Sequence, residues 1–131
     1  MCREWAGPEK QYEKFGIRQL RLQTWDTAAP TLENLQRGIA FAKGAPAGTK
    51  TFIHCKGGIG RAATMAISVL MDKQRHIGPK GALEQLTAKR SIVSQNILKY
   101  PVVKQLHDIL TDGTKSKGES DKAPTPNKGE L

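Results

Sequence analysis

Two short segments have the hydrophobic pattern of β-strands. Residues 17–23 alternate apolar and polar side chains, which is the pattern of a strand with one buried face. Residues 51–54 are a β-branched and aromatic run followed directly by a cysteine, which is typical of a buried strand. The pattern therefore predicts strands over 17–23 and over 51–54.

The remaining apolar positions recur at helical spacing. Residues 9–15 form a short helical pattern that Gly16 ends, and Thr31 can cap a helix with apolar residues at 35, 39 and 41. Residues 62–71 predict a mostly apolar helix. Two more helices are expected to begin at Gly78-Pro79 and at Pro101, since proline is favoured in the first helical turn. The stretch from 90 to 100 is expected to be irregular or partly helical.

Because strands alternate with helices, the predicted class is α/β, with a mostly parallel central sheet flanked by helices. Further strands that such a sheet needs do not precede residue 17, so the sequence is expected to be a truncated chain or one with a misplaced start. Sites in these sheets lie at the carboxyl ends of the strands. Asp26 and Cys55 follow the two predicted strands, so both are expected on one rim.

Composition changes towards the C-terminus and divides the chain. Residues 1–111 are predicted to form one catalytic domain, whereas residues 112–131 are rich in Lys, Ser, Gly, Pro and acids and predict a disordered polar tail. The net charge of +9 lies entirely in residues 1–111, where 17 Lys and Arg face 8 Asp and Glu, while the last 20 residues carry four of each.

A basic domain favours anionic partners, namely phosphorylated substrates, an acidic membrane surface or nucleic acid. Aromatic residues are not interleaved with the basic ones, so no nucleic-acid partner is expected. Solubility is an equally good explanation for the charges away from the site. The two cysteines suit a reducing compartment. No apolar run is long enough to span a bilayer, and no secretory signal is visible. A monomer is expected.

The strongest chemical signal is the loop from Cys55 to Arg61. Glycines at 57, 58 and 60 lie between a predicted strand and a predicted helix, so backbone N–H groups and the helix N-terminus can bind an anion. Five residues separate the cysteine from the arginine, and the guanidinium can hold two phosphate oxygens. Such positive surroundings lower a cysteine pKa from about 8.5 to between about 3.5 and 7.5. The alternative is a buried cysteine beside an incidental arginine.

This pattern resembles the signature of the cysteine-dependent tyrosine and dual-specificity phosphatases, in which a glycine stands where Gly58 does. The resemblance implies a thiolate nucleophile at Cys55, a phosphate clamp at Arg61 and a phosphate-binding loop formed by residues 56–61: Lys56, Gly57, Gly58, Ile59, Gly60 and Arg61. His54 is expected to organise the loop rather than act as a general base. No cofactor and no metal are implied, and the single histidines at 76 and 107 read as surface residues.

A leaving oxygen needs a proton donor on a nearby loop. Asp26 is the only acid between the predicted strand and the helix at Thr31, so it is the candidate general acid; a solvated aspartate or a helix cap are the alternatives. Residues 12–26 and 30–38 resemble the acid-loop region of the mitochondrial protein tyrosine phosphatase and phosphatidylglycerophosphatase family. The similarity covers about residues 1–110. It implies a phosphatase that acts on a phospholipid head group such as phosphatidylglycerophosphate, and a mitochondrial location.

Lys56 is typical of relatives that act on charged lipid head groups, although a solvated loop lysine is also possible. The family's usual hydroxyl residue after the arginine is Ala62 here. Three functions stay open: a lipid phosphatase, a dual-specificity protein phosphatase, and a weakly active phosphate-binding module that Ala62 and the truncated N-terminus would favour. A reversible disulfide between Cys2 and Cys55 is a further hypothesis, and a chance terminal cysteine is at least as good an explanation.

Overall fold

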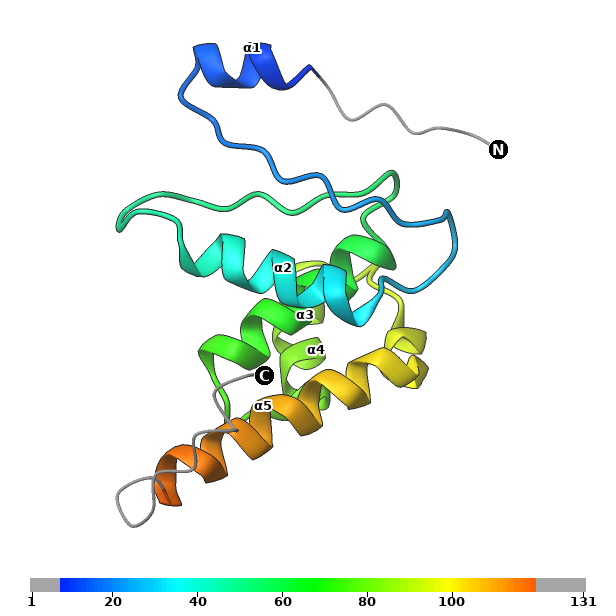
Figure 1. The fold of residues 1–131 in the computed structure, drawn as a ribbon. Helices are drawn as coiled ribbons and strands as arrows, with labels where there is room; N and C mark the ends of the chain where they lie inside the picture. The colour runs from blue at the N-terminus through cyan, green and yellow to red at the C-terminus, as the bar shows by residue number, and fades with distance from the viewer. Residues whose placement is uncertain (1–7, 120–131) are drawn as a thin grey trace.

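The computed structural model describes residues 8–119, with the side chains of residues 8–113. The order of elements is α1 Glu9–Lys14, α2 Leu32–Lys43, α3 Arg61–Lys73, α4 Gly78–Lys89, the 3₁₀ helix η1 Gln95–Lys99, and α5 Pro101–Glu119. Helix α3 is central, because it packs against α2, α4 and α5 (Figure 1). The predicted helices are confirmed, and the partly helical stretch between 90 and 100 contains η1.

Local chemistry explains where the helices begin. Thr31 is extended, and its hydroxyl oxygen accepts a hydrogen bond from the Asn34 N–H at 3.1 Å, which caps α2. Pro79 stands in the first turn of α4, and α5 begins at Pro101. The sequence therefore contained the start signals of these helices in its capping and proline residues.

The core lies between α3 and the helices around it. Its fully or almost fully buried side chains include Leu35, Ile67, Met71, Leu83, Ile97 and Leu106. Gly38 lets α2 and α3 approach each other closely, because a Cβ at position 38 would lie 2.3 Å from the sulfur of Met65 in α3. Two hydroxyls are also buried in α3, and both donate to carbonyls four residues earlier, Thr64 to Gly60 and Ser68 to Thr64.

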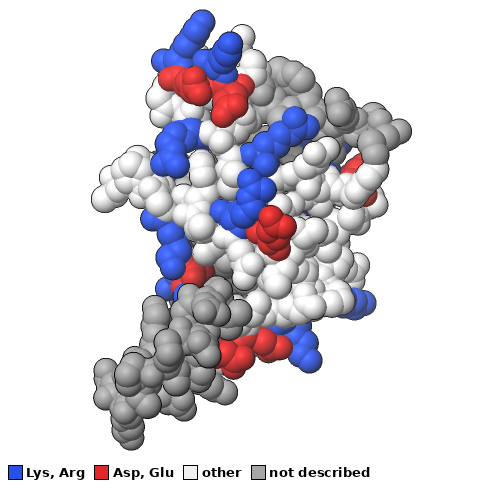
Figure 2. Space-filling view, viewed as in Figure 1, with Lys and Arg blue, Asp and Glu red and all other residues white. Residues whose placement is uncertain are grey.

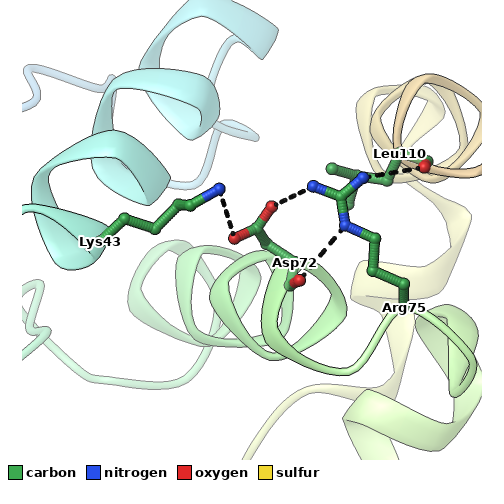
Figure 3. Close-up of polar contacts among 4 residues, drawn as sticks. All are labelled: Lys43, Asp72, Arg75 and Leu110. Atoms are coloured by element: carbon green, nitrogen blue, oxygen red, sulfur yellow. Dashed lines mark hydrogen bonds and ion pairs between the residues drawn. The ribbon is translucent and has the colours of Figure 1, made fainter. Parts of the chain in front are cut away.

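A charged cluster joins the far end of α3 to α2 and α5 (Figure 3). The Asp72 carboxylate, which is almost fully buried, pairs with Lys43 of α2 at 3.4 Å and with Arg75 at 2.9 Å. Arg75 also donates to the Leu110 carbonyl of α5 at 3.1 Å. Breaking such a buried pair leaves an uncompensated charge, so this cluster fixes the position of the α3 C-terminal end.

The predicted parallel sheet is not confirmed. Within residues 8–119 neither 17–23 nor 51–54 is a strand; both are extended segments that run across the helices (Figure 1). A strand is defined by a hydrogen-bonded ladder to a neighbour, and the described residues form no such ladder. The alternation itself is present, because Leu22 and Ile53 pack against the core while Phe52 and His54 face outward.

Helix α5 continues to Glu119, so the predicted tail boundary at 112 falls inside a helix. Residues 120–131 lie outside the described part, and the division into two regions stays a prediction. None of the helices among the described residues is long and apolar enough to cross a membrane. Figure 2 shows the basic side chains of one face in separate groups, interspersed with acidic ones.

Candidate active site

The 55–61 loop leads from an extended segment into the first turn of α3. Cys55 is half-buried at its base, and the Gly58 N–H donates to the cysteine sulfur at 3.2 Å. Gly58 has φ +70°, a left-handed conformation that glycine adopts without steric cost. The loop therefore turns back on itself so that its own amides face the thiol.

The electrostatics of the loop favour the Cys55 thiolate. Burial of the sulfur raises the pKa of Cys55, but the N–H groups of Ala62, Gly58 and Gly57 and the charge of Arg61 together lower it below the ordinary thiol value. These donors stabilise the thiolate, which is the nucleophilic form of cysteine. The predicted lowering of the Cys55 pKa agrees with the direction of this shift.

Arg61 is the first residue of α3, and its side chain is only 12% exposed. Its guanidinium contacts the Asp26 carboxylate at 2.9 Å and the Thr24 carbonyl at 3.4 Å. Asp26 lies on a turn after the first extended segment, 60% exposed. Its carboxylate also accepts from the Thr27 N–H at 3.0 Å. Thr27 has φ +63°, which is an unfavourable conformation for a β-branched residue.

These residues meet around one cavity of about 250 Å³. Asp26, Cys55 and Arg61 line it together with Ile59, Gly60 and Tyr100. The expectation that Asp26 and Cys55 lie close together agrees with this arrangement, although the part of the chain that the structure describes forms no sheet there. The cavity combines a thiol, a guanidinium and a carboxylate within one small volume, which are the groups that phosphoryl transfer to a cysteine requires.

A second cavity of about 300 Å³ shares Cys55 and Gly57 with the first. Lys56 and His54 line this second cavity rather than the one that contains Asp26. The His54 ring stacks on Phe52, with 5.4 Å between the ring centroids. The roles predicted for Lys56 and His54 therefore remain predictions.

Sequence reasoning missed two residues at the site. Arg90, which follows α4, lines the second cavity, and its guanidinium approaches the Gly57 carbonyl at 3.5 Å. Tyr100 lines the first cavity. Both lie more than 25 positions from the loop in the sequence, and no local motif signals the contact. Only the packing of α4 and α5 against α3 brings them there.

Thr64 is the first hydroxyl residue after Arg61. It lines neither cavity, and its hydroxyl donates to the Gly60 carbonyl at 2.8 Å. The hypothesis of a disulfide with Cys2 falls outside the described residues. Among residues 8–119 no three His, Cys, Asp or Glu side chains are grouped as metal ligands.

Comparison with known proteins places this geometry in a family. The model of the dual specificity phosphatase catalytic domain matches residues 1–108. The chain belongs to the dual specificity phosphatase family. A mouse relative, phosphatidylglycerophosphatase and protein-tyrosine phosphatase 1, is 38% identical over 104 residues, which cover 78% of this chain and 53% of that protein. The chain thus spans about half the length of this relative.

Solved structures support the same assignment. The crystal structure of PTPMT1 superposes on the chain with a TM-score of 0.74 at 34% identity, covering 84% of this chain and 71% of that one. The crystal structure of PTPMT1 in complex with PI(5)P gives a TM-score of 0.74 at 34% identity, over 82% and 70% of the two chains. The described residues therefore have a dual-specificity-phosphatase-like fold.

Proposed function

We propose that this chain hydrolyses phosphomonoesters through a cysteinyl-phosphate intermediate, with a phospholipid head-group phosphate such as that of phosphatidylglycerophosphate as its substrate. The observation that carries the proposal is the meeting of Cys55, Arg61 and Asp26 around one cavity. The relatives' names support the substrate class, since the mouse protein is a phosphatidylglycerophosphatase and one solved relative is in complex with PI(5)P.

In the first step the Cys55 thiolate attacks phosphorus and forms an S–P bond, while the bond from phosphorus to the leaving oxygen breaks. Arg61 and the amides of the 55–61 loop hold the non-bridging oxygens. Asp26 gives its proton to the leaving oxygen. Asp26 lines the same cavity as Cys55 and Arg61, which supports this role.

In the second step water attacks phosphorus and the S–P bond breaks. Asp26, now a carboxylate, takes the proton of that water, and the thiolate leaves with its electron pair. Inorganic phosphate is released and the starting state returns. The N–H donors that lower the pKa of Cys55 also stabilise the departing thiolate.

The direct test is phosphate release from phosphatidylglycerophosphate, compared with a panel of tyrosine and threonine phosphopeptides, by the wild-type chain and by Cys55→Ser. We expect turnover of the lipid by the wild type and none by the variant, while binding of inorganic phosphate survives because Arg61 and the amides remain. Substantial activity in Cys55→Ser would exclude the mechanism.

A second candidate is a dual-specificity protein phosphatase, which the other half of the mouse protein's name favours. The chemistry is identical, so the phosphopeptide arm of the same assay decides between the two substrates. A weakly active phosphate-binding module is the third candidate, and Ala62 favours it. Binding without release from any of these substrates would identify it.

We also propose that the chain is a monomer that contacts acidic membranes peripherally in mitochondria, and that it does not bind nucleic acid. The net charge of +9 and the exposed Trp25 and Ile59 beside the site support a membrane contact. Cosedimentation with vesicles that contain cardiolipin, with neutral vesicles as the control, measures it. Equal binding to both kinds of vesicle would contradict the charge argument.

A further inference from the structure

Two carbonyls of the 55–61 loop are held from outside by the same short segment. The Gly57 carbonyl accepts from the Arg90 guanidinium at 3.5 Å, which is long for a hydrogen bond. The Ile59 carbonyl accepts from the Ser94 N–H at 3.0 Å. Both donors belong to residues 90–94, which connect α4 to η1. We call these residues the 90–94 segment.

The geometry of the peptide unit makes these outer contacts matter inside the loop. In a trans peptide the C=O and the following N–H point in opposite directions. The Gly57 carbonyl belongs to the same peptide as the Gly58 N–H, which donates to the Cys55 sulfur at 3.2 Å. A donor that holds the carbonyl outward therefore keeps the N–H directed at the sulfur. The Ile59 carbonyl and the Gly60 N–H also share one peptide. Because Ser94 holds that carbonyl, the Gly60 N–H points away from Ser94.

The loop has little packing of its own to fix these peptides. A Cβ built on Gly57 would meet nothing closer than 3.7 Å, and one built on Gly60 would meet nothing within 4 Å. Glycine residues rotate easily between conformations when neighbours do not restrain them. Contacts from outside the loop must therefore supply the restraint. Gly58 is the exception, because Arg90 lies 3.0 Å from where its Cβ would be.

We propose that the 90–94 segment is a positioning element, in which Arg90 and the Ser94 N–H hold the carbonyls of Gly57 and Ile59 outward so that the following amides face the thiolate and the bound phosphate. Neither residue lines the cavity that contains Asp26. Arg90 lines the second cavity, which also contains Cys55, so its variants must separate an effect of its charge from an effect on the loop. The part that concerns phosphate rests on the proposed function, whereas the part that concerns the thiolate does not.

The thiol is the reporter for the test. The charged and titratable groups that line the two cavities around it are Asp26, Arg61, Tyr100, His54, Lys56 and Arg90. The rate of alkylation of Cys55 by iodoacetamide is measured against pH in a Cys2→Ser background, without any substrate. Turnover of p-nitrophenyl phosphate is measured separately. Thermal melting checks that each variant is folded.

Arg90→Ala should move the midpoint of Cys55 alkylation to higher pH. It should also lower kcat about tenfold, which is less than the roughly 10²–10³-fold decrease in kcat when a group that donates directly to the oxyanion is removed. Arg90→Gln keeps a donor without a charge and should restore much of both. Lys89→Ala removes the neighbouring exposed cation and should change neither. If Arg90→Gln behaves like Arg90→Ala while Arg90→Lys is normal, Arg90 acts by charge alone and its positioning role is wrong.

Ser94 gives an uncharged version of the same test. Its φ of −67° suits proline, so Ser94→Pro removes the N–H, and the proline ring takes the place of the hydrogen bond to the Ile59 carbonyl and should displace that carbonyl. Ser94→Ala is the matched control, because it removes only the hydroxyl that caps η1 through Asn96 at 3.2 Å. We expect Ser94→Pro, and not Ser94→Ala, to shift the alkylation midpoint and to lower kcat.

The two proposals can fail separately. A folded Ser94→Pro whose alkylation profile matches that of Ser94→Ala would overturn the positioning role of Ser94, even if the wild type is an active phosphatase. Conversely, a wild type that hydrolyses no phosphomonoester but shows the expected alkylation shifts would overturn the proposed function and retain the positioning element.

Discussion

The helices and the extended segments of this chain are packed very differently. In α2, α3 and α5 the core side chains are fully or almost fully buried, as are Leu35, Ile67 and Leu106. In the extended region Ile17 is 50% exposed and Phe52 is 86% exposed. Apolar burial is the main source of stability, so the helical region supplies most of it and the extended region depends on few contacts.

The candidate active site lies across the boundary between these two regions. Arg61 belongs to the well-packed α3, whereas Asp26 belongs to the loosely packed extended region. Their ion pair at 2.9 Å is one direct link between the two regions. Under the proposed mechanism, the well-packed region holds the phosphate and the loosely packed region supplies the proton.

Replacing the acid tests that division most strongly. Asp26→Asn should slow the hydrolysis of alkyl phosphates by about 10²–10⁴-fold, because general acid help is lost, but should have little effect on activated aryl phosphates. Steady-state kinetics on both substrate types measures the difference. Equal losses on the two would mean that Asp26 serves another purpose, such as holding Arg61 in place.

A pair of truncations to alanine compares the two regions in stability. Leu35→Ala opens a cavity in the helical core and should cost about 2–5 kcal/mol. Ile17→Ala, a matched aliphatic truncation at a half-exposed site, should cost less than about 0.5 kcal/mol. Urea unfolding followed by circular dichroism gives both values. Similar costs would show that the extended region contributes more to stability than its exposure suggests.

The pH dependence of Cys55 tests the electrostatics at the boundary. Because the folded pKa of Cys55 is lowered, its alkylation should begin at lower pH in the folded chain than in urea. The thiolate then contributes stability that is complete above the unfolded pKa and is lost as pH falls through the folded pKa. Coincident alkylation profiles for the two states would contradict the role of the loop donors.

The smallest expected effect concerns Ala62. A hydroxyl there could hydrogen-bond the departing sulfur, so Ala62→Ser should raise the steady rate severalfold more than the burst rate. Rapid-quench kinetics on an activated phosphate, with Ala63→Ser as the neighbouring control, separates the two steps. No burst in the wild type, together with no gain in Ala62→Ser, would show that the loop amides already suffice.

The sequence predicted the parts that depend on local chemistry. The Thr31 cap and Pro101 start their helices, and the spacing of Cys55 and Arg61 places a cysteine and an arginine at one loop. Asp26 could be chosen because its loop contains no other acid. Each of these signals lies within a few residues of the feature it determines.

The sequence could not predict what depends on distant partners. Strands require neighbours that supply a ladder, so the alternating pattern at 17–23 could not show whether a strand forms; of its apolar positions Leu22 packs against the core, whereas Ile17 is half-exposed. Arg90 reaches the loop across 33 positions in the chain. The helix beyond 112 continues a packed helix, since adding a turn costs far less than starting one.

The two ends of helix α3 carry different groups. Arg61 stands at one end, and the Asp72 cluster with Lys43 and Arg75 fixes the other. Arg61 and Asp72 are about 17 Å apart along the helix axis, so a tilt of α3 by roughly 4° about its Asp72 end would displace Arg61 by about 1 Å. Misplacement of that size can cost about 10²-fold in rate. If the proposed function holds, a change at Lys43 should alter the rate from a remote surface, without any change in the residues around Cys55.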